Sequence, residues 1–288
     1  MTLLALALVL ASALAHATWN YLAKSSRDKG AFMWAFVALS SVIYLPVAGY
    51  FASASPVPPD GWIYAVGTML LHVAYFSLLG AAYAREDLSV VYPAARGTGI
   101  VLVPLVAAVT LGERVSPAGA LAIAAIVAGI VVAHTRGSGW PAVAGLARSF
   151  GSKGSRLALL TGVTIAAYSA WDKQGVSLVN PLVYIYFVFL GQALAGAPGA
   201  LWRWEALRRE VRERKGAIVA AAVLSPLAYL LVLVALTFSQ VSYVAASREV
   251  GIVVGALLGA TVLKEPHGRN RLLGSAAIVV GVFGLALA

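Results

Sequence analysis

Hydrophobic residues occur in ten long runs along the chain, and short polar stretches separate them. The runs cover residues 2–23, 31–52, 61–84, 88–111, 116–134, 156–175, 180–201, 216–238, 241–263 and 268–287. Each is close to the ~20 residues that a helix needs to cross ~30 Å of hydrocarbon. The hydrophobicity is continuous and does not alternate, which favours helices over a β-barrel. The pattern predicts an all-α polytopic membrane protein with ten transmembrane helices.

The first run contains the small-residue string ASALAHA (11–17), which is typical of a signal-peptide cleavage site. No positively charged residue precedes this apolar run, and the repeat described below gives it a partner in mid-chain. We therefore interpret it as a transmembrane helix.

Composition agrees with a membrane environment. Of the 288 residues, 61% are hydrophobic and only 11% are charged, whereas a soluble domain is nearer one quarter charged. The absence of cysteine excludes disulfides, iron–sulfur clusters and thiolate zinc sites.

The net charge of +10 does not indicate nucleic acid, because the basic residues lie in short loops between apolar runs. Most of the 21 lysines and arginines fall in the loops after the first, third, fifth, seventh and ninth runs. By the positive-inside rule these loops are cytoplasmic, and both termini are expected outside.

The two halves of the chain resemble each other. RGTGIVLVPLVAAVTLGE (96–113) and REVGIVVGALLGATVLKE (248–265) agree at eight of 18 positions, and they include Arg96 and Arg248, which are 152 residues apart. The same separation relates Trp19 to Trp171. The sequence therefore predicts a first five-helix repeat at 1–135, a connecting loop at 136–154 and a second repeat at 155–288.

Five helices per repeat is an odd number, so the second repeat is expected to be inverted in the membrane. Inverted repeats are typical of secondary transporters, whose substrate site lies between the repeats near the midplane. Arg96 and Arg248 are expected to face that central cavity, since a charge within a span is costly in lipid. Two interpretations stay open for them: contact with a substrate, or structural pairing, in which Arg248 binds Glu249 or a carbonyl.

Aromatic and polar residues in several runs are candidates for the same cavity. His16, Trp19 and Asn20 share one helix face because they are three and four residues apart, and Tyr168, Trp171 and Asp172 repeat that arrangement. Such a cavity suits a substrate with an apolar or aromatic body and a charged head. The alternative for the tryptophans and tyrosines is the interfacial belt of any membrane protein. The predicted substrate-binding residues are His16, Trp19, Asn20, His72, Tyr75, Tyr92, Arg96, Tyr168, Trp171 and Arg248.

No metal, cofactor or catalytic centre is expected. His16 and His72 have no carboxylate in register that would favour a metal site; they suit a polar contact or proton coupling. The 11 acidic residues are scattered, and no phosphate-binding loop or nucleophile motif occurs.

Two further motifs favour structural roles. Gly251, Gly255 and Gly259 are spaced for close packing of the ninth helix. Glu113 and Glu265 are expected to brace the turn into the following helix, because the N-terminus of a helix favours a negative charge.

Three stretches carry a resemblance to a known family: HATWNYLAK (16–24), VVYPAARGTGIVLVPLVAAVTLGERVS (90–116) and REVGIVVGALLGATVLKE (248–265). The chain resembles the drug/metabolite transporter superfamily, in its ten-helix EamA group, and within it is similar to the bacterial aromatic amino acid exporters. The resemblance implies two inverted repeats around a central cavity in the bacterial inner membrane. Members of this group are often described with both termini in the cytoplasm, whereas the loop charges here indicate the reverse.

The expected function is export of small amphipathic metabolites, above all aromatic or other hydrophobic amino acids, by alternating access. Other transporter substrates stay open, namely nucleotide sugars, cationic drugs and polyamines. Two other classes are a membrane-embedded lipid-phosphate enzyme and a non-transporting assembly partner. The expected partners are a small-molecule substrate and the lipid bilayer, and we expect a monomer.

Overall fold

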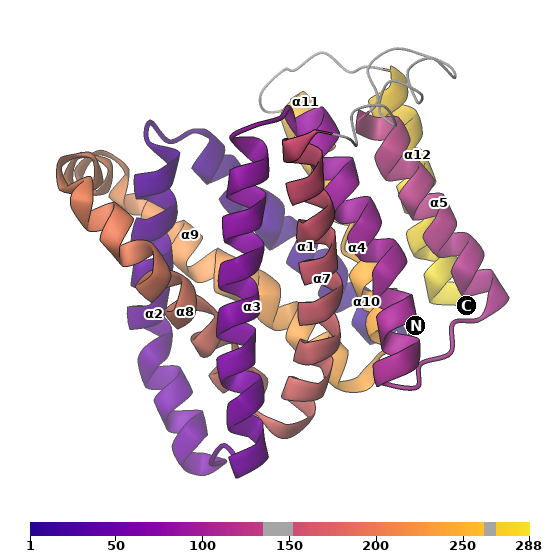
Figure 1. Cartoon of the computed structure of the whole chain (residues 1–288), viewed down its shortest axis with the longest axis horizontal. Coiled ribbons are helices and arrows are strands. Elements are labelled where there is room, and N and C mark those ends of the chain that lie inside the picture. Colours follow the sequence, from indigo (N-terminus) through magenta and orange to yellow (C-terminus); the bar gives the residue numbers. More distant parts are fainter. Residues whose placement is uncertain (135–151, 262–268) are drawn as a thin grey trace. The chain divides into compact units, whose positions relative to one another are not determined.

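The computed structural model describes residues 1–134, 152–261 and 269–288, and across these residues every regular element is a helix (Figure 1). The helices are α1 (Leu3–Lys24), α2 (Lys29–Ala54), α3 (Pro59–Tyr83), α4 (Leu88–Thr110), α5 (Pro117–His134), α7 (Lys153–Leu178), α8 (Pro181–Trp202), α9 (Trp204–Phe238), α10 (Val241–Ser247), α11 (Val250–Thr261) and α12 (Arg269–Leu287). The prediction of an all-α chain is confirmed.

Eight of the described helices are long and apolar enough to cross a membrane by length and composition. They are α1, α2, α3, α4, α5, α8, α9 and α12. The other two predicted spans correspond to α7 and to the segment that holds α10 and α11. The helices start within a few residues of the apolar runs, with one exception at α9.

The start of α9 differs from the sequence prediction. We expected a loop up to residue 216, but the helix already begins at Trp204 and includes the Arg- and Glu-rich stretch. Its backbone departs from helical geometry at Arg214, where φ is −127° and ψ is 22°. The early turns are held by buried groups, since Leu207 is 4% exposed and Glu210 accepts the Asp28 amide at 3.2 Å. A charged helix of this kind carries no long apolar run, so hydrophobicity alone does not reveal it.

The predicted ninth span is broken. Helix α10 ends at Ser247 and α11 begins at Val250, so the single helix expected over 241–263 is wrong. At the break, amides bond to the carbonyl three residues earlier: Glu249 to Ala246 at 3.2 Å and Gly251 to Arg248 at 3.0 Å. These tight turns replace the regular helical bonds. Residues 262–263 lie outside the described part of the chain.

Several helix starts are 152 residues apart, as the sequence repeat requires. Asp28 caps α2 by accepting the Ala31 amide at 3.0 Å, and Asn180 caps α8 by accepting the Leu182 amide at 2.9 Å. These side chains satisfy amides that have no partner inside a helix. The first residues of α5 and α12, Pro117 and Arg269, show the same spacing.

The described chain forms two compact units, each with residues from both predicted repeats. Unit 1 contains Met1–Leu10, Ala74–Ala170 and Phe238–Ala288, and unit 2 contains Ala11–Val73 and Trp171–Thr237. These units do not follow the boundaries at residues 135 and 155. The division into inverted repeats therefore stays a prediction.

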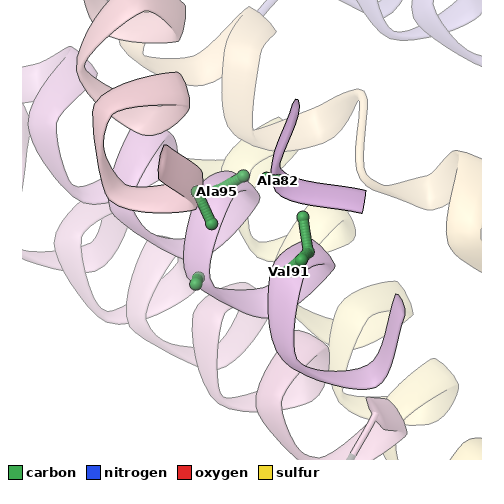
Figure 2. Packing of buried hydrophobic residues seen from close by; sticks show 5 residues of the cluster. Ala82, Val91 and Ala95 are labelled. Atoms are coloured by element: carbon green, nitrogen blue, oxygen red, sulfur yellow. The ribbon is translucent and has the colours of Figure 1, made fainter. Parts of the chain in front are cut away.

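The core of unit 1 is built from small side chains. Ala82, Val91, Ala94, Ala95 and Ala158 form a buried cluster between α3, α4 and α7 (Figure 2). Small residues let helix backbones approach closely, which is how helices associate in lipid.

Helices α5 and α12, which lie side by side (Figure 1), are in extensive contact within unit 1. A Cβ atom at Gly274 would lie 2.5 Å from the Gly129 carbonyl oxygen and from the Ala133 amide nitrogen. By contrast, a Cβ at Gly251 would meet nothing within 4 Å. The predicted glycine contact on the ninth span is therefore wrong at Gly251, and the surroundings of Gly255 and Gly259 lie outside the described residues.

Unit 2 packs α2 against α8 and α9. The Trp34 indole donates to the Ala193 carbonyl at 3.0 Å, and the Ser40 hydroxyl lies 2.9 Å from the Ala222 carbonyl. Ser12 of α1 donates to Ala228 at 2.6 Å. These side-chain bonds to carbonyls of neighbouring helices fix the helices that carry the polar network described below.

Candidate functional site

The ten predicted site residues divide equally between the two units. Unit 1 holds Tyr75, Tyr92, Arg96, Tyr168 and Arg248, and unit 2 holds His16, Trp19, Asn20, His72 and Trp171. In each unit, some of these residues lie in a cluster around a buried carboxylate.

The unit 1 cluster centres on Glu249, at the break between α10 and α11. Its side chain is 4% exposed and lies 3.4 Å from Nη1 of Arg96, whose side chain is 17% exposed. The Tyr92 hydroxyl donates to the other carboxylate oxygen at 3.4 Å. Both distances exceed the 2.7–2.9 Å of a tight charge-assisted hydrogen bond. The opposite charges are thus neighbours without being tightly joined.

Aromatic rings lie near the Arg96 guanidinium. It lies 5.8 Å from the centre of the Tyr92 ring, within cation–π range. Tyr75 and Tyr168, whose rings meet edge to face at 5.5 Å, lie within electrostatic range of the guanidinium. Tyr92 in turn stacks on His134 at 4.8 Å. The structure therefore brings four of the predicted residues, Tyr75, Tyr92, Arg96 and Tyr168, into one cluster.

Glu113 holds the first turn of α10. Gly112, with φ of +66°, ends α4 in a left-handed turn that favours glycine. The Glu113 carboxylate then accepts the Val241 amide at 2.6 Å and the amide and hydroxyl of Ser242 at 3.1 and 2.6 Å. The expectation that Glu113 braces the following helix, α5, is wrong, because it caps α10 instead. Glu265 lies outside the described residues.

Arg248 follows α10 directly as its C-cap. The structure places Arg96, the residue that corresponds to Arg248 in the first half of the chain, beside Glu249. Both roles considered for Arg248, substrate contact and structural pairing, stay predictions.

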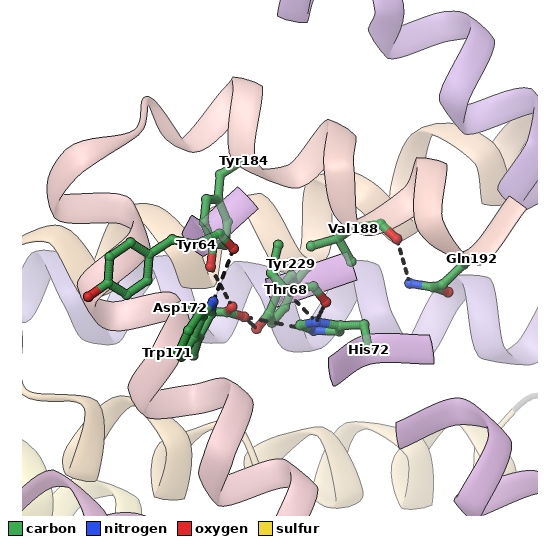
Figure 3. A network of polar contacts seen from close by, with 9 residues as sticks. All are labelled: Tyr64, Thr68, His72, Trp171, Asp172, Tyr184, Val188, Gln192 and Tyr229. Atoms are coloured by element: carbon green, nitrogen blue, oxygen red, sulfur yellow. Dashed lines mark hydrogen bonds and ion pairs between the residues drawn. The ribbon is translucent and has the colours of Figure 1, made fainter. Parts of the chain in front are cut away.

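The unit 2 cluster centres on Asp172 of α7, which is fully buried (Figure 3). Tyr184 donates to Oδ1 at 2.8 Å and Tyr229 donates to Oδ2 at 2.5 Å. Nε2 of His72 lies 3.8 Å from the same Oδ2. Three helices, α3, α8 and α9, thus direct a titratable side chain at one carboxylate.

The orientation of His72 is fixed from its other nitrogen. Nδ1 lies 3.0 Å from the carbonyl oxygen of Thr68, one turn earlier on α3, and 3.1 Å from its hydroxyl. The edge of the His72 ring meets the Tyr229 ring, with centres 5.2 Å apart. Nε2 is thereby directed at Asp172 (Figure 3).

The two equivalent tryptophans have different surroundings. Trp171 donates to the Tyr64 carbonyl at 3.1 Å and covers Gly67, where a Cβ would lie 2.4 Å from the indole. Trp19 packs against His16 and Phe36, and its buried Nε1 has no hydrogen-bond partner among the described residues.

Asn20 donates to a carbonyl of its own helix. The acceptor is the His16 carbonyl oxygen, at 2.8 Å. The substrate roles predicted for these unit 2 residues stay predictions.

The ten predicted residues do not include those at the centre of the two clusters. The sequence placed Asp172 on one face with Tyr168 and Trp171 and offered Glu249 as a partner of Arg248, but neither was predicted to bind substrate. Tyr184 and Tyr229 were not predicted to bind substrate either. The available signal was the acidic residue inside an apolar run, because an intramembrane carboxylate marks a functional position by default.

The clusters offer charge pairing and hydrogen bonding. Within residues 1–134, 152–261 and 269–288, no three histidine, aspartate or glutamate residues are grouped so as to hold a metal ion.

Comparison with known proteins supports a transporter. Residues 152–287 match the EamA-like transporter family. A solved chain described only as "Crystal structure of protein" is 18% identical, with a TM-score of 0.75 over 100% of this chain and 98% of the other. It is one of 28 solved chains that match, and at this identity the likeness shows the fold alone. No curated protein matches.

The family match confirms the resemblance to EamA transporters over residues 152–287. Together with the long apolar helices, it makes the chain a polytopic membrane protein of all-α class. Residues 152–287 form a domain of the EamA-like transporter family.

Proposed function

We propose that this protein is a secondary transporter of the bacterial inner membrane that exports aromatic or other hydrophobic amino acids by alternating access. The EamA-like domain supports transport of a small molecule across the bilayer. The substrate class rests on one observation, the loosely joined pair of Arg96 and Glu249 among tyrosine rings.

The pair offers both signs of charge to a ligand. The carboxylate of an amino acid would replace Glu249 on Arg96, and its ammonium group would bind Glu249. Because the two side chains are 3.4 Å apart, separating them breaks no tight hydrogen bond. Each charge then gains a new partner, so neither is left buried and unpaired.

The neighbouring rings suit the rest of the substrate. Tyr75 and Tyr168 are 7% and 3% exposed and already meet edge to face. An aromatic or branched apolar side chain would extend this ring packing, which contributes about 0.5–1.5 kcal/mol per aromatic pair beyond burial.

The same pair argues against substrates with one sign of charge. A polyamine or cationic drug would place its charge beside Arg96, and a nucleotide sugar or lipid phosphate would place negative charge beside Glu249. Like charges brought together at a binding site cost several kcal/mol. A zwitterion meets both groups without this cost.

The test is competition for exchange in proteoliposomes. Vesicles loaded with unlabelled phenylalanine take up labelled phenylalanine by counterflow, and the competitors are phenylalanine, 3-phenylpropionate and phenethylamine. 3-Phenylpropionate lacks the ammonium group and phenethylamine lacks the carboxylate. Each loss should cost roughly 2–5 kcal/mol of binding free energy. We therefore expect them to compete at least about thirtyfold less well than phenylalanine.

Paired variants locate the effect. Glu249→Gln should abolish the discrimination against 3-phenylpropionate, whereas Arg85→Gln, an exposed arginine on the same unit, should leave the competition series unchanged. Equal competition by all three compounds, or no counterflow of any amino acid, would refute the proposed substrate class.

A further inference from the structure

The carboxylate of Asp172 is more tightly held than that of Glu249, and its partners can exchange protons. Its two oxygens accept from Tyr184 and Tyr229 at 2.8 and 2.5 Å, and His72 faces it at 3.8 Å. On its own helix the neighbouring Lys173 directs Nζ to the Leu236 carbonyl at 2.5 Å. The Asp172 and His72 side chains are 0% and 6% exposed.

The contacts of His72 allow two neutral tautomers. Nδ1 can donate to the Thr68 carbonyl at 3.0 Å, or it can accept from the Thr68 hydroxyl at 3.1 Å. Nε2 is an acceptor in the first tautomer and a donor in the second. In both tautomers Nε2 is the nitrogen that faces Oδ2 of Asp172, at 3.8 Å.

With His72 neutral, an ionised Asp172 is a buried charge that the facing imidazole does not neutralise. Burying a charge without a counter-charge is costly. When a proton binds, the pair becomes either imidazolium beside carboxylate or neutral histidine beside carboxylic acid, and either arrangement removes the uncompensated charge. The Asp172–His72 pair is therefore suited to hold one exchangeable proton.

We propose that Asp172 and His72 form a proton-binding site through which the protein couples transport to proton movement. The proposal rests on the proposed transport function and adds the coupling ion to it. In each cycle the site takes one proton from water on one side of the membrane and releases it to water on the other. No other bond is made or broken.

The Arg96–Glu249 pair is not suited to this role. Arginine stays protonated in proteins, so the charge beside Glu249 is permanent. At Asp172 the facing cation forms only when the proton binds. Charge compensation at Asp172 therefore depends on the proton, which is the property a coupling site requires.

The experiment uses the purified full-length protein in liposomes with the membrane potential clamped at zero. A gradient of one pH unit stores about 1.4 kcal/mol per proton, which supports roughly a tenfold accumulation of labelled phenylalanine for one proton exchanged. We expect accumulation for one polarity of the gradient. We also expect proton movement, detected by a pH-sensitive dye, when an amino acid gradient is imposed.

The decisive variant is Asp172→Asn, which keeps the shape and an acceptor for the tyrosines but cannot exchange a proton. It should retain counterflow and lose both accumulation and the dye signal. Asp60→Asn, the same change at an exposed position in α3, should behave like the unmodified protein. Folding is checked by the counterflow itself, which needs no net proton movement.

A measurement without transport supports the assignment. In ¹⁵N spectra of histidine-labelled protein, the signal that disappears in His72→Gln should show one protonated ring nitrogen at high pH and two as the pH falls. Counterflow without accumulation under either polarity would overturn coupling and leave the proposed function standing. Coupling is equally overturned if Asp172→Asn accumulates substrate normally. Absence of counterflow in the unmodified protein would refute the proposed function itself.

Discussion

Replacement of Gly274 by alanine should weaken the contact between α5 and α12. The new Cβ would lie 2.5 Å from the Gly129 carbonyl oxygen and from the Ala133 amide nitrogen. Both atoms belong to a helix backbone, so no flexible side chain can move aside. Carbon contacts need about 3.5 Å or more, so the two helices must separate by roughly 1 Å.

The magnitude follows from two opposing effects. Overpacking of this kind costs typically about 1–3 kcal/mol, whereas replacing a helical glycine with alanine gains about 0.5–1 kcal/mol from backbone entropy. Gly80→Ala is the matched control, since a Cβ at Gly80 of α3 would meet nothing within 4 Å. The backbone gain is common to both variants and cancels in their difference. The difference in free energy of unfolding should therefore equal the steric cost, roughly 1–3 kcal/mol.

The assay is equilibrium unfolding in mixed micelles as the fraction of denaturing detergent rises, followed by far-ultraviolet circular dichroism. Gly274→Ala should unfold at a lower fraction than the unmodified protein, and Gly80→Ala at an equal or higher one. Equal midpoints for the two variants would mean that α5 and α12 do not touch along their backbones, and the packing argument would fail.

Two further substitutions test helix caps. Glu113→Ala removes the acceptor of three hydrogen bonds at the start of α10. It should lower the free energy of unfolding by about 0.5–2 kcal/mol. In the same detergent assay, Glu113→Gln should be closer to the unmodified protein. Asp28 accepts the Ala31 amide and also contacts Arg203 at 2.5 Å. Asp28→Asn should preserve most of the stability, because asparagine caps equally well and an exposed ion pair contributes little. Asp28→Ala should lower the free energy of unfolding by about 1 kcal/mol. Equal losses in the two variants would assign the stability to the ion pair.

The membrane helices were predictable because lipid imposes a strong constraint. A span must satisfy its own backbone hydrogen bonds and be long enough to cross the hydrocarbon, so apolar runs located most helix starts to within a few residues. The early turns of α9 were not predicted because Trp204–Arg214 has no apolar run. The break at Arg248–Glu249 was not predicted either, since the residues on both sides form one continuous hydrophobic segment.

The candidate site was less predictable because its pairs join distant parts of the chain. Arg248 is the sequence neighbour of Glu249, but the arginine that the structure shows beside the Glu249 carboxylate is Arg96. It is 153 residues away and is brought there by the packing of α4 against α10. The role proposed for Asp172 likewise depends on its contacts with His72, Tyr184 and Tyr229, which come from three other helices.

The glycine contact between α5 and α12 has a mechanical consequence. Helices that touch through their backbones have no side chains between them that could switch rotamers. They therefore resist sliding past each other and move as one rigid body. A change of shape within unit 1 is then most easily absorbed where the helical bonding is already interrupted. Between α10 and α11 that place is the break beside Glu249, the residue that we propose binds the ammonium group of the substrate.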